Sequence, residues 1–192
     1  MPERPNAACK ADLYEFQYAF ARRYFETCRG VFREYALHHL YLGCRFSSAP
    51  RPAVRACADV ADVVSFNLYQ REINPEEWTG KNELPKPIII GEFHFGARDR
   101  GMFHEGLVPC LNQKERAQAY AQYVRSVATC PAFVGCHWFQ YIDEPLTGRW
   151  FDGENYNIGF VDVTDTPYPE LVRAARAIHS HVYRLRNQAG PR

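Results

Sequence analysis

The chain has 192 residues, of which 46% are hydrophobic and 15% aromatic, enough for the packed core of one domain and too apolar for a disordered protein. Its 23 basic and 22 acidic residues give a net charge of +1, so charge does not support a nucleic-acid or anionic-membrane partner. No run approaches the roughly 18 apolar residues of a membrane span, and the first residues lack the apolar core of a signal peptide. As written, the chain is expected to stay in the cytoplasm where it is made.

Helices and strands are predicted to alternate along the chain. Residues 1–11 form a loose lead-in, and Asp12, with Glu15 three residues later, marks the N-cap of an amphipathic helix that runs to about Tyr35. The elements that follow are a strand at 40–46, a helix at 52–58, strands at 63–69 and 87–93, a helix at 113–128, a strand at 133–140 and a closing helix at 169–185. This order predicts an α/β protein with right-handed crossovers and a parallel sheet whose strands are adjacent in chain order.

One domain over residues 1–192, with its core at about 12–185, is the simplest organisation, because no repeat or low-complexity segment interrupts the alternation. The seven cysteines include no C-x-x-C pair, so neither a zinc site nor a disulfide framework is indicated. Several lie in apolar stretches, and we interpret them as small buried hydrophobic residues in a reducing compartment.

The stretch from Lys86 to Gly96 is the most informative part of the sequence. Three successive isoleucines favour a strand that is covered on both faces, and the strand ends at Glu92 and His94, which share one face. Placing a carboxylate at the end of such a strand costs free energy unless the carboxylate forms an ion pair or takes part in a reaction. A structural ion pair and a catalytic role are both compatible with this position.

Polar side chains gather at the ends of all four predicted strands, the edge at which ligands bind in parallel α/β folds. Arg45 is the expected partner that keeps Glu92 ionised, which suits a nucleophile, and Tyr69 is expected to donate a hydrogen bond to the same carboxylate. Trp138 could be a core residue or a platform under a sugar ring, and we favour the platform. The predicted ligand-binding residues are Arg45, Asn67, Tyr69, His94, Trp138 and Gln140.

Other chemistries find less support in the sequence. No Gly-rich phosphate loop or G-x-S-x-G turn is present, so no nucleotide cofactor is expected. His94, His104 and His137 could join Glu92 in a metal-dependent hydrolase, but no H-E-x-x-H or comparable spacing supports a metal site. A metal-dependent hydrolase is therefore kept only as an alternative function.

Several segments resemble the last four strands of the (β/α)₈ barrel of retaining glycoside hydrolases, and the similarity is greatest to the β-agarases, relatives of the β-galactosidase clan. The most specific part is Gly91-Glu92-Phe93-His94-Phe95-Gly96 with the Asp99–His104 run that follows. The segments that carry the resemblance are 40–46, 64–69, 90–96, 137–141 and 154–160.

The resemblance implies a TIM-barrel type fold of which this chain is only the C-terminal half-barrel, strands 5 to 8. It also implies that Glu92, at the end of the seventh strand, is the catalytic nucleophile, and that Trp138 lines the sugar subsite. The general acid/base of the family follows an Asn at the end of the fourth strand, which has no counterpart here. Asn82-Glu83 matches that dipeptide only superficially, because it lies in a loop before the seventh strand.

The activity implied is retaining hydrolysis of a β-galactan of the agarose type through a glycosyl-enzyme on Glu92. The substrate would be a polysaccharide or oligosaccharide, with no cofactor, and the family is often secreted. The alternative is a catalytically inactive carbohydrate-binding or structural remnant of such a barrel. Because a cut barrel exposes two sheet edges, we also expect self-association or binding of a complementary half-barrel.

Overall fold

The computed structural model describes residues 5–48, 50–80 and 83–190, so Asn82 of the Asn82-Glu83 dipeptide lies outside the described residues. Helices and strands alternate, which confirms the predicted α/β class. In chain order the elements are α1 (Ala7–Tyr35), β1 (Arg45–Phe46), α2 (Arg51–Val60), β2 (Val64–Asn67), the 3₁₀ helix η1 (Pro75–Trp78), β3 (Ile88–Phe93), α3 (Gln113–Thr129), β4 (Phe133–Trp138), α4 (Pro169–His179) and α5 (Val182–Gln188).

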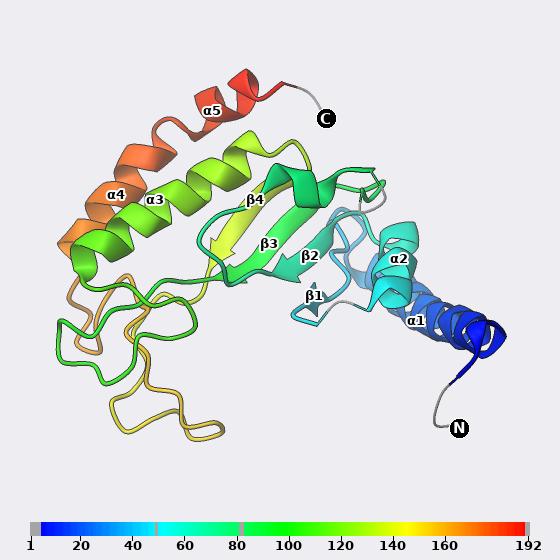
Figure 1. Cartoon of the computed structure of the whole chain (residues 1–192), viewed down its shortest axis with the longest axis horizontal. Helices are drawn as coiled ribbons and strands as arrows, with labels where there is room; N and C mark the ends of the chain where they lie inside the picture. Colours follow the sequence, from blue (N-terminus) through cyan, green and yellow to red (C-terminus); the bar gives the residue numbers. More distant parts are fainter. Residues whose placement is uncertain (1–4, 49, 81–82, 191–192) are drawn as a thin grey trace.

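The four strands form one sheet in the order β1-β2-β3-β4, and every neighbouring pair is parallel, as predicted (Figure 1). Their carboxyl ends therefore lie at the same edge. The register is irregular near that edge: Phe66 pairs with Ile90, but the next residue, Asn67, pairs with Glu92. A bulge of this kind re-aims side chains locally, and here it falls beside the predicted site.

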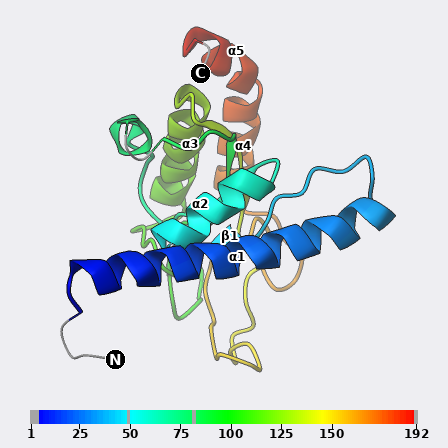
Figure 2. The same cartoon turned by 90° about the vertical axis from the view of Figure 1, so that its right-hand side faces the viewer.

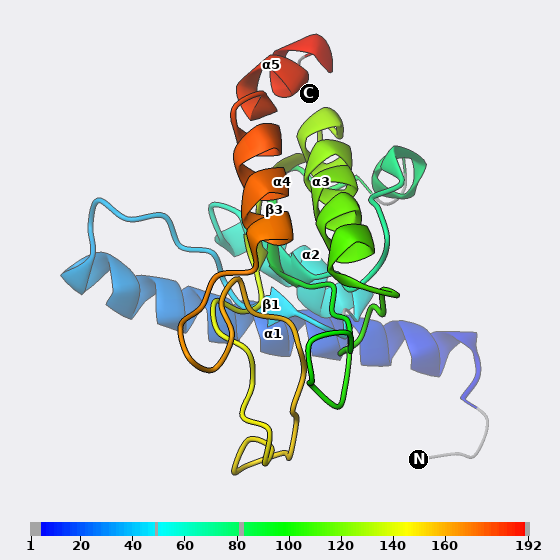
Figure 3. The same ribbon diagram turned by 90° about the vertical axis from the view of Figure 1, so that its left-hand side faces the viewer.

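One face of the sheet is covered by helices. Ile88 and Ile90 are fully buried, and Phe93 stacks on Tyr123 of α3 with ring centroids 4.2 Å apart. Each such buried side chain contributes about 1.5–3 kcal/mol to stability. Figure 3 shows α3 and α4 side by side over this face. Ile89, between Ile88 and Ile90, is only partly buried, so the second face of the strand is covered less completely than the sequence predicts.

Three predicted boundaries change. The first helix begins at Ala7, not Asp12, because the Asn6 side chain caps it by accepting from the Cys9 N–H at 2.8 Å. The predicted strand at 40–46 is reduced to two residues, since the Tyr41 N–H and carbonyl both bond to Asp62 instead of a strand. The closing helix is divided into α4 and α5 at Ser180, whose hydroxyl bonds to the Ala177 carbonyl and competes with the backbone ladder.

Both ends of the sheet are open: no further strand among the described residues pairs with the outer edge of β1 or of β4. The long helix α1, which lies across α2 in Figure 2, buries only Ala21 and Phe25. None of the helices in the described ranges is both long and apolar enough to cross a membrane. The exposed large apolar side chains of α1 recur at helical spacing and are Leu13, Phe16, Phe20, Tyr24, Val31 and Tyr35.

Candidate active site

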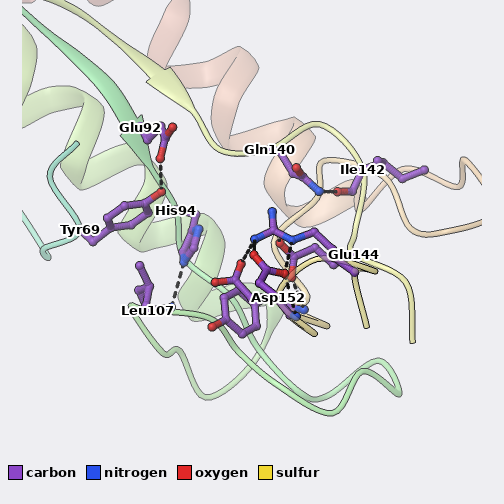
Figure 4. Close-up of polar contacts among 11 residues, drawn as sticks. Tyr69, Glu92, His94, Leu107, Gln140, Ile142, Glu144 and Asp152 are labelled. Carbon is purple, nitrogen blue, oxygen red and sulfur yellow. Dashed lines mark hydrogen bonds and ion pairs between the residues drawn. The ribbon is translucent and has the colours of Figure 1, made fainter. Parts of the chain in front are cut away.

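Glu92 lies near the end of β3 and keeps 20% of its side chain exposed. The Arg45 guanidinium donates to its Oε1 at 2.9 Å. The Tyr69 hydroxyl donates to its Oε2 at 2.7 Å (Figure 4). Both carboxylate oxygens are therefore fixed by donors from two neighbouring strand ends. The structure brings together the three residues that the sequence singled out for this contact.

Gly91 allows Arg45 to reach the carboxylate. A Cβ at position 91 would lie 2.7 Å from the Ser65 hydroxyl oxygen and 2.9 Å from the Arg45 Cδ and Cγ atoms. Because Gly91 has no side chain, the aliphatic part of the Arg45 side chain can pass over β2 to reach β3. Asn67 is opposite Glu92 in the sheet register, and its buried Oδ1 accepts no hydrogen bond from the described part of the chain.

Tyr69 remains a hydrogen-bond donor over the whole physiological range. Burial, the hydrogen bond to Glu92 and the charges of Glu92 and Glu154 all raise the pKa of its phenol well above the usual value. A protonated phenol against a carboxylate is a charge-assisted hydrogen bond, which is stronger than a bond between neutral groups.

His94 is 1% exposed, so it has no surface for a ligand, and the prediction that it contacts substrate is corrected. Its Nε2 accepts the Leu107 N–H at 2.9 Å, which assigns the ring proton to Nδ1 (Figure 4). Burial lowers its pKa to about 4, so the imidazole is neutral. The ring packs on Tyr69 with centroids 4.7 Å apart, and it therefore supports the phenol that holds Glu92.

Trp138 ends β4, is partly buried and packs against the core. Its indole N–H donates to the Ile158 carbonyl at 2.8 Å, and its ring packs edge-on against Phe93 and Tyr120 at 5.1 and 5.3 Å. These contacts favour the core interpretation, but the residue stays partly exposed, and the platform remains a prediction. The Gln140 amide donates to the Ile142 carbonyl at 3.1 Å, a bond within its own loop (Figure 4).

The histidines proposed for a metal site do not converge. His104 packs on Tyr156 at 4.8 Å and accepts the Gly106 N–H, while His137 is exposed on β4. Within the described ranges, no three His, Cys, Asp or Glu side chains gather in a way that could hold a metal ion. The metal-dependent alternative gains no support from this arrangement.

Sequence reasoning missed an ion cluster in the loop after β4. Arg149 binds Glu144 at 3.2 Å, Asp152 at 2.5 Å, and Glu154 (Figure 4). Its guanidinium lies 5.8 Å from the ring of Phe139. Glu144 is fully buried, and burial raises the pKa of its carboxyl. The only signal in the sequence was the density of glycines and charges between 144 and 154.

A second missed network ties the site strand to this loop. Arg116 of α3 is fully buried and donates to the Phe95 carbonyl at 2.7 Å, the Gly159 carbonyl at 2.6 Å and the Gln113 side chain at 3.0 Å. Burial lowers the pKa of Arg116 to about 10, so it stays charged at neutral pH. Asp143, three residues after the predicted strand at 133–140, is buried and accepts the Gly159 N–H at 2.7 Å, which gives it a structural role.

Comparison with known proteins supports the resemblance noted in the sequence. No family model matches the chain. β-Agarase B and β-agarase A of Vibrio sp. (strain JT0107) are 48% and 45% identical to it over 181 and 184 residues, each covering 92% of this chain but 19% and 18% of the relative. The solved structure of an exo-β-agarase superposes with a TM-score of 0.93 at 46% identity, over 96% of this chain and 25% of that one. The similarity to β-agarases is confirmed, and the chain spans about a fifth of the length of these curated relatives.

Proposed function

We propose that this chain, homologous to one segment of the β-agarases, is the C-terminal half of a retaining glycosidase barrel in which Glu92 is the nucleophile. The observation that carries the proposal is the Arg45–Glu92–Tyr69 arrangement at the carboxyl edge of a parallel sheet. Nucleophilic carboxylates in enzymes of this type are kept ionised and oriented by neighbouring donors.

In the proposed reaction, one oxygen of Glu92 attacks the anomeric carbon of a β-linked galactose unit. The bond from that carbon to the leaving oxygen breaks, the leaving oxygen takes a proton from a general acid, and a covalent glycosyl-enzyme forms. Water then attacks the same carbon, gives up a proton to the former acid and releases Glu92 as a carboxylate. During the first step, the oxygen of Glu92 that does not attack keeps its donor, Arg45 or Tyr69.

The general acid must come from outside the set of residues that surround Glu92. In retaining enzymes the two carboxyl groups stand about 5–5.5 Å apart. Glu83 precedes β3 and is exposed, whereas Glu92 is near the far end of that strand, and the strand residues from Ile88 to Glu92 alone span about 13 Å. Glu83 therefore cannot take the part of the acid, and the missing half of the barrel is the proposed source.

The half-barrel, with these strands as numbers 5 to 8, is the second part of the proposal. A complete (β/α)₈ barrel takes about 250 residues and leaves no sheet edge, whereas here β1 and β4 have open outer edges. The helix α1 packs at the β1 end of the sheet, where Phe25 meets Phe46, and its exposed apolar side chains are left for the rest of such a barrel to cover. On this proposal residues 1–192 are one partial catalytic domain.

The proposed substrate is a β-galactan of the agarose type, inferred from the names of the relatives. The proposal predicts covalent labelling of the chain by an activated 2-fluoro-galactoside, because a reactive leaving group needs little protonation. Intact-mass measurement should show one adduct, absent in Glu92→Gln and retained in Glu83→Gln. Natural agarose oligosaccharides should turn over negligibly, since general acid catalysis is worth about 10²–10⁴-fold.

Two outcomes would contradict the assignment of Glu92. One is an adduct on a different residue, and the other is hydrolysis of a natural oligosaccharide that survives Glu92→Gln. If no adduct forms, even after the chain is mixed with the N-terminal part of a homologous β-agarase, the inactive carbohydrate-binding or structural remnant becomes the better description.

A further inference from the structure

The most exposed large aromatic side chain of the described residues is Trp150, at 94%, and its neighbour Phe151 is 61% exposed. The two rings touch edge-on with centroids 5.4 Å apart. The other two tryptophans, Trp78 and Trp138, pack against the hydrophobic core. The two adjoining rings form one exposed aromatic patch, and contiguous exposed apolar patches mark binding surfaces.

The backbone of this loop is held in place. The Arg149 N–H donates to the Glu154 carbonyl and the Gly153 N–H donates to the Arg149 carbonyl, both at 2.8 Å, which closes a small turn around Trp150. Gly148 has φ +86°, and a Cβ there would lie 2.7 Å from the Gly153 carbonyl oxygen, so the turn depends on a glycine at this position. Arg149 also lies over the Phe151 ring at 4.7 Å.

The loop is continuous with the candidate active site. Arg149 lies 5.8 Å from the ring of Phe139, which directly follows β4, and the charge of Glu154 contributes to the raised pKa of Tyr69. Figure 1 shows the loop that follows β4 extending beyond the carboxyl ends of the strands, and Figure 4 shows the ion cluster on the same side as Tyr69 and Glu92. A polymer cleaved at Glu92 would therefore extend past this loop.

We propose that Trp150 is a stacking platform for a galactose ring of the substrate chain, at a subsite away from the bond that is cleaved. This inference rests on the proposed function and adds a binding residue to it. A galactose ring has an apolar C–H face and a rim of hydroxyl groups. The exposed indole matches the face, and the partly exposed carboxylates of Asp152 and Glu154 beside it can accept hydrogen bonds from the rim.

The test is a titration of the ¹⁵N-labelled chain with neoagarohexaose, followed by the indole N–H signals. The chain has three tryptophans, and the signal of Trp150 is assigned from its loss in Trp150→Phe. We expect the Trp150 signal to shift while those of Trp78 and Trp138 stay. Trp150→Ala should raise the Kd for the hexasaccharide roughly tenfold, and Trp150→Phe should raise it less. Labelling of Glu92 by the monosaccharide reagent should be unchanged in both variants, because a single ring does not reach the loop.

The outcomes separate this inference from the proposed function. If Glu92 is labelled but the Trp150 signal does not shift, or if Trp150→Ala binds as tightly as the parent chain, the platform is wrong and the nucleophile stands. If Trp150 shifts and Glu92 is never labelled, the subsite stands without the hydrolase. A Trp150 signal that moves with protein concentration in the absence of sugar would show that the ring contacts protein instead, and would overturn the proposal.

Discussion

Arg116→Met tests whether a single buried guanidinium holds the site strand against the loop after β4. Methionine has a similar length and can still pack under Trp138 and Tyr168, whose rings lie 5.8 and 5.2 Å from the guanidinium carbon. The substitution removes the donors to the Phe95 and Gly159 carbonyls and leaves both buried acceptors without them. It also removes the positive charge that faces the buried carboxylate of Asp143.

The expected loss in the free energy of unfolding follows from these contacts. Each buried acceptor left without a partner costs about 1–3 kcal/mol, and loss of one partner of a buried charge pair typically costs about 3–5 kcal/mol in total. With a urea slope of about 2 kcal/mol per M, the midpoint of unfolding should fall by about 1.5–2.5 M. Because Arg116 joins Phe95 to the loop, the variant should also label more slowly at Glu92.

Urea unfolding followed by circular dichroism measures the midpoint. Arg125→Met on the exposed side of the same helix is the matched control, expected to change stability by no more than about 0.5 kcal/mol. A midpoint for Arg116→Met that falls no further than that of Arg125→Met would refute the reasoning.

Two further predictions concern pH and association. Burial lowers the pKa of His94 to about 4, so below pH 6.5 the unfolded chain binds a proton that the folded chain does not. This group should therefore lower the free energy of unfolding by about 3 kcal/mol between pH 7 and pH 4. Urea melts at both pH values should show that His94→Gln abolishes this loss, whereas the control His137→Gln, at an exposed position, still shows it. Equal pH slopes in parent and His94→Gln would count against it. The isolated chain should self-associate, or bind the N-terminal part of a homologous β-agarase, through its open sheet edges and the apolar side of α1. Sedimentation of a monomer over a wide concentration range would contradict this, and Phe16→Glu with Phe20→Glu should weaken the association.

The contact between Glu92, Arg45 and Tyr69 could be predicted from the sequence because topology places these residues at one edge of the sheet. Alternating helices and strands require a parallel sheet, and a parallel sheet places the carboxyl ends of its strands at one edge. Any polar residues that end those strands are then neighbours, whatever the details of packing. The same logic predicted the order of the strands, which the structure confirms.

The roles of Trp138 and His94 depended on the tertiary structure. The two-residue period of a strand shows that its side chains alternate between the two faces of the sheet, but it does not show which face is covered. Here Trp138 pairs with Phe93 across an irregular register, which packs its ring against the core, while His94 is buried beside Tyr69. Arg116 donates to backbone carbonyls that lie 21 and 43 positions away in the sequence. Arg149 binds carboxylates within its own tight loop. No local pattern encodes such contacts, because a buried charge is tolerated only when distant parts of the chain converge to satisfy it.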